Sequence, residues 1–144
     1  MPIELIWLIP NKILLSRWTG RVEVDDMRVL IEELLIIFDE APTVIHTVLD
    51  MSNVEYISSD AFYLYLQSPA ARHARRGRIG LVQPSFQATM LADLMNQLSN
   101  RELIRVFETR EAARDYLMGH DSPPPTLNNP PETSADTPTE PPTE

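Results

Sequence analysis

The feature that most constrains the fold is an apolar, β-branched run that is followed closely by a polar helix start. Residues 44–49 form the run, and side chains of this kind suit a buried strand of a sheet. Ser58, Ser59 and Asp60 come next and can cap a helix that contains Phe62 and Tyr65. Hydroxyls and a carboxylate then lie beside free backbone N–H groups, which predicts a binding place for an anion, a regulatory phosphate or a partner loop.

Candidate strands and helices alternate around this run and predict an α/β fold. We expect strands at residues 3–9, 13–19, 44–49, 78–82 and 104–107, and helices at residues 25–40, 59–77, 84–97 and 109–118. A turn at residues 10–12 predicts an initial antiparallel hairpin, whose second strand ends at Gly20, and Gly77 closes the second helix. Single strands between helices favour parallel pairing, so we predict a mainly parallel mixed sheet of four to five strands with about four helices.

Ser68 and Pro69 predict a break in the second helix, with Ser68 as the new cap.

Helical periodicity predicts which helix faces are buried. Val29 and Ile36 lie opposite the apolar stripe of the first helix and are candidates for self-association in a weak homodimer. The predicted inward positions are Met27, Leu30, Ile31, Leu34, Leu35 and Phe38 in the first helix, and Phe86, Met90, Leu91, Leu94 and Leu98 in the third.

Composition divides the chain into a domain at residues 1–120 and a tail at residues 121–144. The tail holds eight of the thirteen prolines, five acidic residues and no Lys or Arg, which predicts a disordered acidic segment. The domain carries sixteen acidic and twelve basic residues, a net charge of −4, and this argues against nucleic-acid binding. The chain has no leader-like start and no apolar stretch of about 20 residues, so we expect a cytoplasmic protein without stable membrane insertion.

The residues give no sign of an enzyme, a cofactor or a metal site. The chain has no cysteine, which excludes thiol nucleophiles and Cys-ligated zinc. It has neither a Gly-x-Ser-x-Gly turn nor a glycine-rich phosphate loop. His46, His73 and His120 do not have metal-ligand spacing, and His46 is expected to be a packed or edge residue of a strand and not a ligand. We therefore expect a domain that is not an enzyme and acts without a cofactor.

Residues 50–61 carry a resemblance to a known family. The sequence Asp-Met-Ser-Asn-Val-Glu-Tyr-Ile-Ser-Ser-Asp-Ala, together with the element order, resembles the STAS domain, the SpoIIAA-like fold of bacterial anti-sigma-factor antagonists. The family pattern is approximately Asp-Leu-Ser-x-Val-x-Phe-Ile-Asp-Ser-Ser-Gly. Matching positions are Asp50, Ser52, Val54, Ile57 and Ser59. The resemblance covers residues 3–118 and implies a non-catalytic regulatory domain that binds an anti-sigma factor or a serine-kinase-like regulator.

The chain departs from the family pattern at the position that matters for regulation. The serine that family members phosphorylate corresponds to Asp60, and the glycine that follows it corresponds to Ala61. A carboxylate cannot accept phosphate from a serine kinase, and it brings less charge than a phosphate does. The resemblance therefore implies a partner surface at Ser58, Ser59, Asp60 and Ala61 without the usual phospho-switch, with Ser58 or Ser59 as alternative phosphosites.

Two further groups of residues have functional readings. Arg72, Arg75 and Arg76 form a basic cluster at a predicted helix end, which predicts either dipole compensation or a patch for an anionic partner. The alternative to a protein-binding domain is a carrier of a small apolar ligand or lipid. Candidate pocket walls for such a carrier are Trp7, Trp18, Phe62 and Tyr65.

Overall fold

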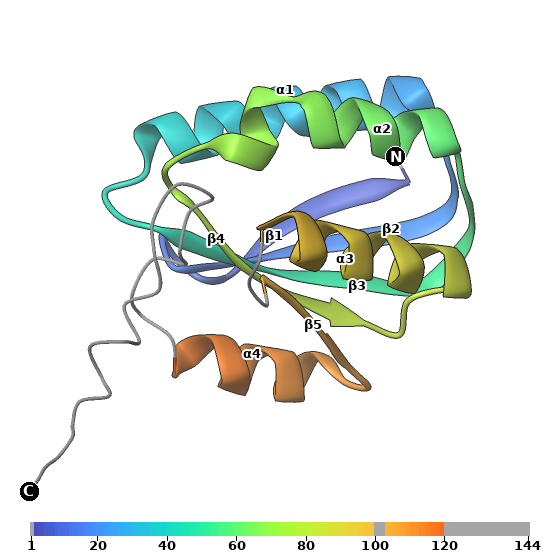
Figure 1. The fold of residues 1–144 in the computed structure, drawn as a ribbon. Helices are drawn as coiled ribbons and strands as arrows, with labels where there is room; N and C mark the ends of the chain where they lie inside the picture. The colour runs from blue at the N-terminus through green and yellow to red at the C-terminus, as the bar shows by residue number, and fades with distance from the viewer. Residues whose placement is uncertain (1, 100–102, 120–144) are drawn as a thin grey trace, which may run out of the picture.

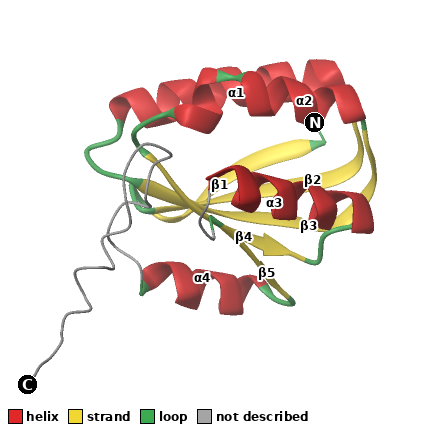
Figure 2. Ribbon diagram, viewed as in Figure 1, coloured by secondary structure: helices red, strands yellow, loops and turns green. Residues whose placement is uncertain are grey.

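The computed structural model describes residues 2–99 and 103–119, and these residues form a mixed sheet with helices on both faces (Figures 1 and 2). The tail at residues 121–144, the domain boundary and His120 lie outside the described residues. The elements are β1 (Ile3–Ile9), β2 (Ile13–Val22), α1 (Val24–Glu40), β3 (Ile45–Ile57), α2 (Ser59–Gln67), the 3-10 helix η1 (Pro69–Arg72), β4 (Arg76–Val82), α3 (Phe86–Ser99), β5 (Ile104–Phe107) and α4 (Arg110–Met118).

The five strands of the described chain lie side by side in sequence order, β1-β2-β3-β4-β5. β1 pairs antiparallel with β2, and every other pair is parallel. The hairpin turn closes where Lys12 N donates to Ile9 O at 3.0 Å, and Asn11 takes a positive φ of 61° there, which asparagine tolerates. This arrangement confirms the predicted mixed sheet with an antiparallel edge.

The helices divide unequally between the two faces of the sheet. α1, α2 and α3 cover one face, where α1 contributes Leu30 and Phe38 and α3 contributes Ala88 and Ala92 to the same core. Among the described elements, α4 alone covers the other face, packing Ala113 and Leu117 on the sheet. Its sheet partners there are Ile13, Leu15, Val48 and Val82.

The structure confirms the predicted face of α1. Met27, Leu30, Ile31, Leu34 and Phe38 are buried, and Leu35 is half-buried. Val29 and Ile36 lie on the opposite side and are 37% and 58% exposed. The break in the second helix is also confirmed, because α2 ends before Ser68, whose Oγ accepts from Ala71 N at the start of η1.

Two strand ends differ from the prediction because glycine and polar residues continue a strand. β2 runs through Gly20 to Val22, with Gly20 at a φ of +66° that glycine adopts without strain. β3 runs on to Ile57, although residues 51–57 looked like a loop. Beyond Asp50 it pairs with β2 but not with β4, through irregular register steps near Gly20. The two strands therefore extend together past the end of β4 and carry the start of α2.

Gly77 does not close a helix, because it lies inside β4, where it packs against β3. A Cβ at this position would lie 2.8 Å from Ile45 O and closer still to His46 Nδ1. His46 Nδ1 cannot move aside freely, because it accepts a hydrogen bond from Arg78 N at 2.9 Å. Glycine is required here by the close approach of two strands.

Gly77→Ala is therefore expected to lower the free energy of unfolding by about 1–3 kcal/mol, the usual cost of overpacking. Gly119→Ala is the matched control, because the nearest atom to its added Cβ would be at 3.6 Å, and its expected effect is within about 0.5 kcal/mol. Urea unfolding of both variants measures the difference. Equal stabilities of the two variants would show that β3 and β4 can separate locally at no cost.

The predicted orientation of α3 is wrong. Phe86, Met90, Leu94 and Leu98 were expected inward, but they are 80%, 56%, 42% and 64% exposed. The helix instead turns its alanines to the sheet, with Ala88 and Ala92 buried and Leu91 half-buried. Both faces of α3 are apolar, and the small side chains allow the closer packing on the sheet, so the larger ones are left outside.

Candidate functional site

The candidate site lies at the start of α2, where the extended end of β3 turns into the helix. Ser58 is the N-cap, and its Oγ accepts from Ala61 N at 3.4 Å. Ser58 N donates to Val22 O at 2.9 Å, which ties this turn to the end of β2. The helix start is therefore held on a rigid pair of strands, as the predicted capping role requires.

The four predicted site residues do not all reach the surface. Ser59 and Asp60 are exposed, whereas the side chains of Ser58 and Ala61 are buried, at 9% and 0% exposure. The buried positions serve capping and packing. The surface that a partner can contact is accordingly made by Ser59 and Asp60, with Asp60 in the first turn, where the helix dipole favours a negative charge.

Exposed tyrosines extend this surface. Tyr63 follows Ser59 and Asp60 by one helical turn, so the three lie on the same side of α2, and Tyr63 is 62% exposed. Tyr56 lies just before the turn, 41% exposed, with the guanidinium carbon of Arg21 4.3 Å from its ring centre. Aromatic residues with a polar group are common in protein interfaces, and sequence reasoning missed both as site residues.

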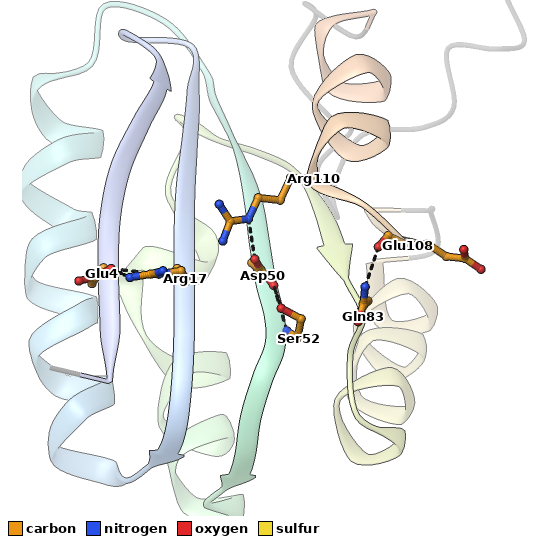
Figure 3. A network of polar contacts seen from close by, with 7 residues as sticks. All are labelled: Glu4, Arg17, Asp50, Ser52, Gln83, Glu108 and Arg110. Atoms are coloured by element: carbon orange, nitrogen blue, oxygen red, sulfur yellow. Dashed lines mark hydrogen bonds and ion pairs between the residues drawn. The ribbon is translucent and has the colours of Figure 1, made fainter.

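A charge pair between a buried carboxylate and a partly exposed arginine anchors the other end of the same strand segment. Asp50 accepts from Ser52 N at 2.9 Å and from Ser52 Oγ at 2.7 Å through one carboxylate oxygen. Its other oxygen accepts from Arg110 Nε at 2.6 Å (Figure 3). The Asp50 side chain is 4% exposed and that of Arg110 is 40% exposed. The pair therefore joins β3 to the first residue of α4.

The hydrogen bonds decide the charge of Asp50. Burial alone would raise the pKa of the Asp50 carboxyl, but the donors from Ser52 and the charged Arg110 outweigh burial and leave that pKa lowered. Asp50 is therefore an ionised structural residue. It was identified from the family pattern, but nothing in the sequence pointed to Arg110, which lies sixty positions away.

The two described histidines, His46 and His73, both hold the backbone around the start of β4, in keeping with the packed position expected for His46. His46 is 4% exposed, and its Nδ1 accepts from Arg78 N. His73 Nδ1 accepts from Arg75 N at 3.0 Å, which places the ring proton on Nε2, 2.8 Å from Asp39 Oδ1. Within residues 2–99 and 103–119, no three potential metal-ligating side chains gather at one place.

The predicted arginine patch is only partly formed. Arg72 is exposed at the end of η1 and Arg75 is half-buried next to it. Arg76 instead lines an interior cavity. The cause is an extra residue at the start of β4: Ile45 pairs with Arg76, and Thr47 pairs with Ile79. β4 therefore advances three residues where β3 advances two. This bulge places Arg76 on the same inner face of the sheet as Ile79.

The cavity lies between the sheet and α1, α2 and α3, and has a volume of about 80 Å³. Three of the four aromatic residues predicted as pocket walls, Trp18, Phe62 and Tyr65, line it, whereas Trp7 does not. The other lining residues are Ser16, Met27, Leu30, Leu34, Phe38, Thr47, Leu49, Met51, Arg76, Ile79, Leu81, Ala88, Leu91, Ala92, Met95 and Ile104. The wall is thus mostly apolar, with one cation.

No helix among the described residues has the length and apolarity needed to cross a lipid bilayer. No protein-family model matches the sequence, and no curated protein matches it.

Solved structures do match the fold. The anti-sigma factor antagonist SpoIIAA in its unphosphorylated form aligns with a TM-score of 0.62 and 18% identity, covering 81% of this chain and 98% of that one. The phosphorylated form of SpoIIAA from Bacillus gives a TM-score of 0.60 and 15% identity over 79% and 98% of the two chains. An uncharacterized DUF3478-family protein from Shewanella loihica, described as having a SpoIIAA-like fold, gives 0.61 and 17% over 80% and 91%.

These matches confirm the predicted fold class. The chain has the SpoIIAA-like fold, built on a five-stranded mixed sheet, and the alignments cover 91–98% of the matched structures. The identities of 15–18% show the fold alone.

Proposed function

We propose that this chain is a non-catalytic regulatory domain that binds another protein through the start of α2. The observation that carries the proposal is the exposed turn of Ser59, Asp60 and Tyr63 on a fold shared with an anti-sigma factor antagonist. The partner class is an anti-sigma factor or a serine-kinase-like regulator in the cytoplasm. The mildly acidic domain and the exposed apolar side chains suit a protein partner better than a nucleic acid.

Regulation in this proposal does not use a phosphate at residue 60. SpoIIAA exists in unphosphorylated and phosphorylated forms. Asp60 supplies a fixed carboxylate at the matching position of this chain, at the N-terminal end of a helix. Partner binding is therefore constitutive and unaffected by serine kinases or phosphatases. Self-association through Val29 and Ile36 is a weaker, separate contact on the exposed face of α1.

Asp60→Ser is expected to change partner affinity by about 1–3 kcal/mol, because it removes a charge from a contact that loses water on binding. Its effect on the free energy of unfolding stays below about 1 kcal/mol. The full chain first captures its partner from a lysate of its own cells, and mass spectrometry identifies it. Titration calorimetry with the purified partner then compares the variant with the wild type.

Glu111→Ser is the matched control. Glu111 is the second residue of α4, as Asp60 is of α2, and both helices have a Ser or Thr cap one residue before their start. Only Asp60 belongs to the proposed surface, so the control should keep full affinity. Equal affinities of both variants and the wild type would reduce Asp60 to a helix-stabilising residue. Phosphate on Ser58 or Ser59 in protein from its own cells would show that a phospho-switch persists at a shifted position.

A carrier of a small apolar ligand is the second candidate function, and the cavity between the sheet and the helices favours it. Three aromatic side chains that the sequence suggested as pocket walls do line this space. Binding of 1-hexanol in the cavity, followed through amide shifts of β4 and α3, tests this function directly. Shifts confined to exposed residues would count against it.

A further inference from the structure

The cavity contains a cation in an otherwise apolar wall. Only Arg76 among its lining residues carries a full charge, and the other polar side-chain groups there are the hydroxyls of Ser16, Thr47 and Tyr65 and the indole N–H of Trp18. The Ser16 hydroxyl already accepts from Trp18 Nε1 at 2.8 Å. A ligand that fills this space therefore has an apolar body and meets positive charge at one place.

The Arg76 guanidinium has no counter-charge in the described part of the chain. No carboxylate of residues 2–99 or 103–119 lies within ion-pair distance of it, and its Nε is buried without a hydrogen-bond acceptor. Its Nη1 donates a hydrogen bond to Gly77 O at 3.3 Å. Burial lowers the pKa of Arg76, an effect that nearby Tyr65 partly offsets. Arg76 is half-buried, and a cation with a buried, unsatisfied Nε and no counter-charge is costly, so an anionic group would relieve that cost.

Arg76 lies at one end of the cavity, so the two ends of the cavity differ in charge. Arg76 pairs with Ile45, the first residue of β3, whereas the lining residues Leu49 and Met51 lie further along that strand. From Ile45 to Met51 the strand advances about 20 Å at roughly 3.3 Å per residue. The charge thus lies at the amino-terminal end of the strand wall, and the apolar residues extend from it.

We propose that the cavity binds a short-chain monocarboxylate, with its carboxylate paired to the Arg76 guanidinium and its chain among the apolar residues of α1, α3 and the sheet. Tyr65 lines the same cavity, so its hydroxyl is a second donor available to the carboxylate. The volume of about 80 Å³ suits a chain of a few carbon atoms. Three lining methionines, Met27, Met51 and Met95, let the wall adapt to a slightly longer one. This inference rests on the second candidate function, ligand binding in the cavity, and is independent of partner binding.

The test is a titration of the full chain with hexanoate, 1-hexanol and hexylamine, followed by amide chemical shifts. Hexanoate is expected to bind at least about tenfold more tightly than 1-hexanol, because it adds a charge-assisted hydrogen bond. Hexylamine should not bind measurably. The shifts should centre on β4 and α2, around Ile79 and Tyr65.

Arg76→Met is expected to remove the preference for hexanoate while it keeps the binding of 1-hexanol. Arg75→Met is the matched control, because Arg75 is the neighbouring arginine and does not line the cavity, so this variant should keep the wild-type preference. Arg76→Lys provides a second variant that retains the charge and should keep a reduced preference.

The binding of the three probes distinguishes an anionic ligand from ligand binding in general. Equal binding of hexanoate and 1-hexanol in the wild type, or an unchanged preference in Arg76→Met, would overturn the anionic ligand and leave the carrier function intact. No binding of any of the three probes would overturn both. Shifts confined to Phe86, Met90 and Leu94 would place the probes on the exposed face of α3 and would also overturn the inference.

Discussion

Arg110→Met is expected to lower the free energy of unfolding at pH 7 by about 2–4 kcal/mol, somewhat less than the loss of a partner from a fully buried pair. The variant leaves the Asp50 carboxylate, 4% exposed, without its counter-charge, while Ser52 still donates to it. The loss of unfolding free energy is expected to be smaller than for a fully buried pair, because Arg110 itself is 40% exposed. Urea unfolding followed by circular dichroism measures the change.

The effect of this substitution should depend on pH. In the wild type the pKa of Asp50 is lowered, so near the ordinary titration range of a carboxyl, about pH 4, the unfolded chain binds more protons than the folded one. The contribution of Asp50 is therefore complete above that range and is lost as the pH falls through its folded-state pKa. In the variant the pKa of Asp50 rises, so the stability difference from wild type should be largest at pH 7 and shrink below about pH 4.

Arg28→Met is the control for this prediction. Arg28 also pairs with an aspartate, with Nη1 2.7 Å from Asp25 Oδ1, but both side chains are more than half exposed. A surface pair of this kind contributes about 0–1 kcal/mol. A loss in Arg110→Met no larger than that in Arg28→Met would mean that Asp50 obtains its stabilisation from Ser52 alone.

Leu34→Ala should cost about 2–5 kcal/mol of unfolding free energy, as large-to-small substitutions in a core do. Leu34 is 6% exposed in the stripe that α1 turns to the sheet. Its removal deletes apolar contacts and enlarges the existing cavity that Leu34 already lines. Denaturant unfolding measures the loss.

Ile36→Ala is the internal comparison, because it removes a similar aliphatic side chain from the same helix. Ile36 is 58% exposed, so the expected change is within about 0.5 kcal/mol. Large losses in both variants of the monomer would mean that α1 is buried on two faces. Alanine has a higher helix propensity than either leucine or isoleucine, so propensity favours both variants. A loss of stability in Leu34→Ala alone therefore reports the orientation of the helix.

The fold could be predicted because most local signals agree with one another. The stripe of α1 repeats at the helical period, the residue 10–12 turn closes a hairpin, and Ser68 with Pro69 marks the break after α2. Each of these depends on neighbours in sequence. The alternation of strands and helices then leaves few ways to arrange a parallel sheet.

The errors arose where distant contacts decide the outcome. The central strand was expected to end at residue 49, but pairing of Asn53, Val54 and Tyr56 with β2 continues it to Ile57. α3 has apolar residues on both faces, so the helical periodicity of its sequence does not determine which face packs on the sheet. The arginines near residue 75 looked like a surface cluster, and only the extra residue in β4 turns Arg76 inward.

At the candidate site, the sequence predicted the turn at residues 58–61 but did not show which of its side chains are exposed. Ser58 and Ala61 are hidden by the cap geometry itself, and the exposed Tyr63 was not among the predicted site residues. A clearer signal was available in its spacing, one turn after the polar pair. Exposure depends on what packs around a helix, and the sequence of the helix alone does not show that.

The unequal division of helices between the two faces has a consequence for synthesis of the chain. Because the strands lie in sequence order, the sheet can grow strand by strand as the polypeptide is made, with short crossovers between neighbours. The face with α1 gains its cover early. The opposite face, with Ile13, Leu15, Val48 and Val82, has only α4 to cover it among the described elements, and α4 is the last of them. Until Ala113 and Leu117 have left the ribosome, that apolar face stays open to solvent and to other nascent chains.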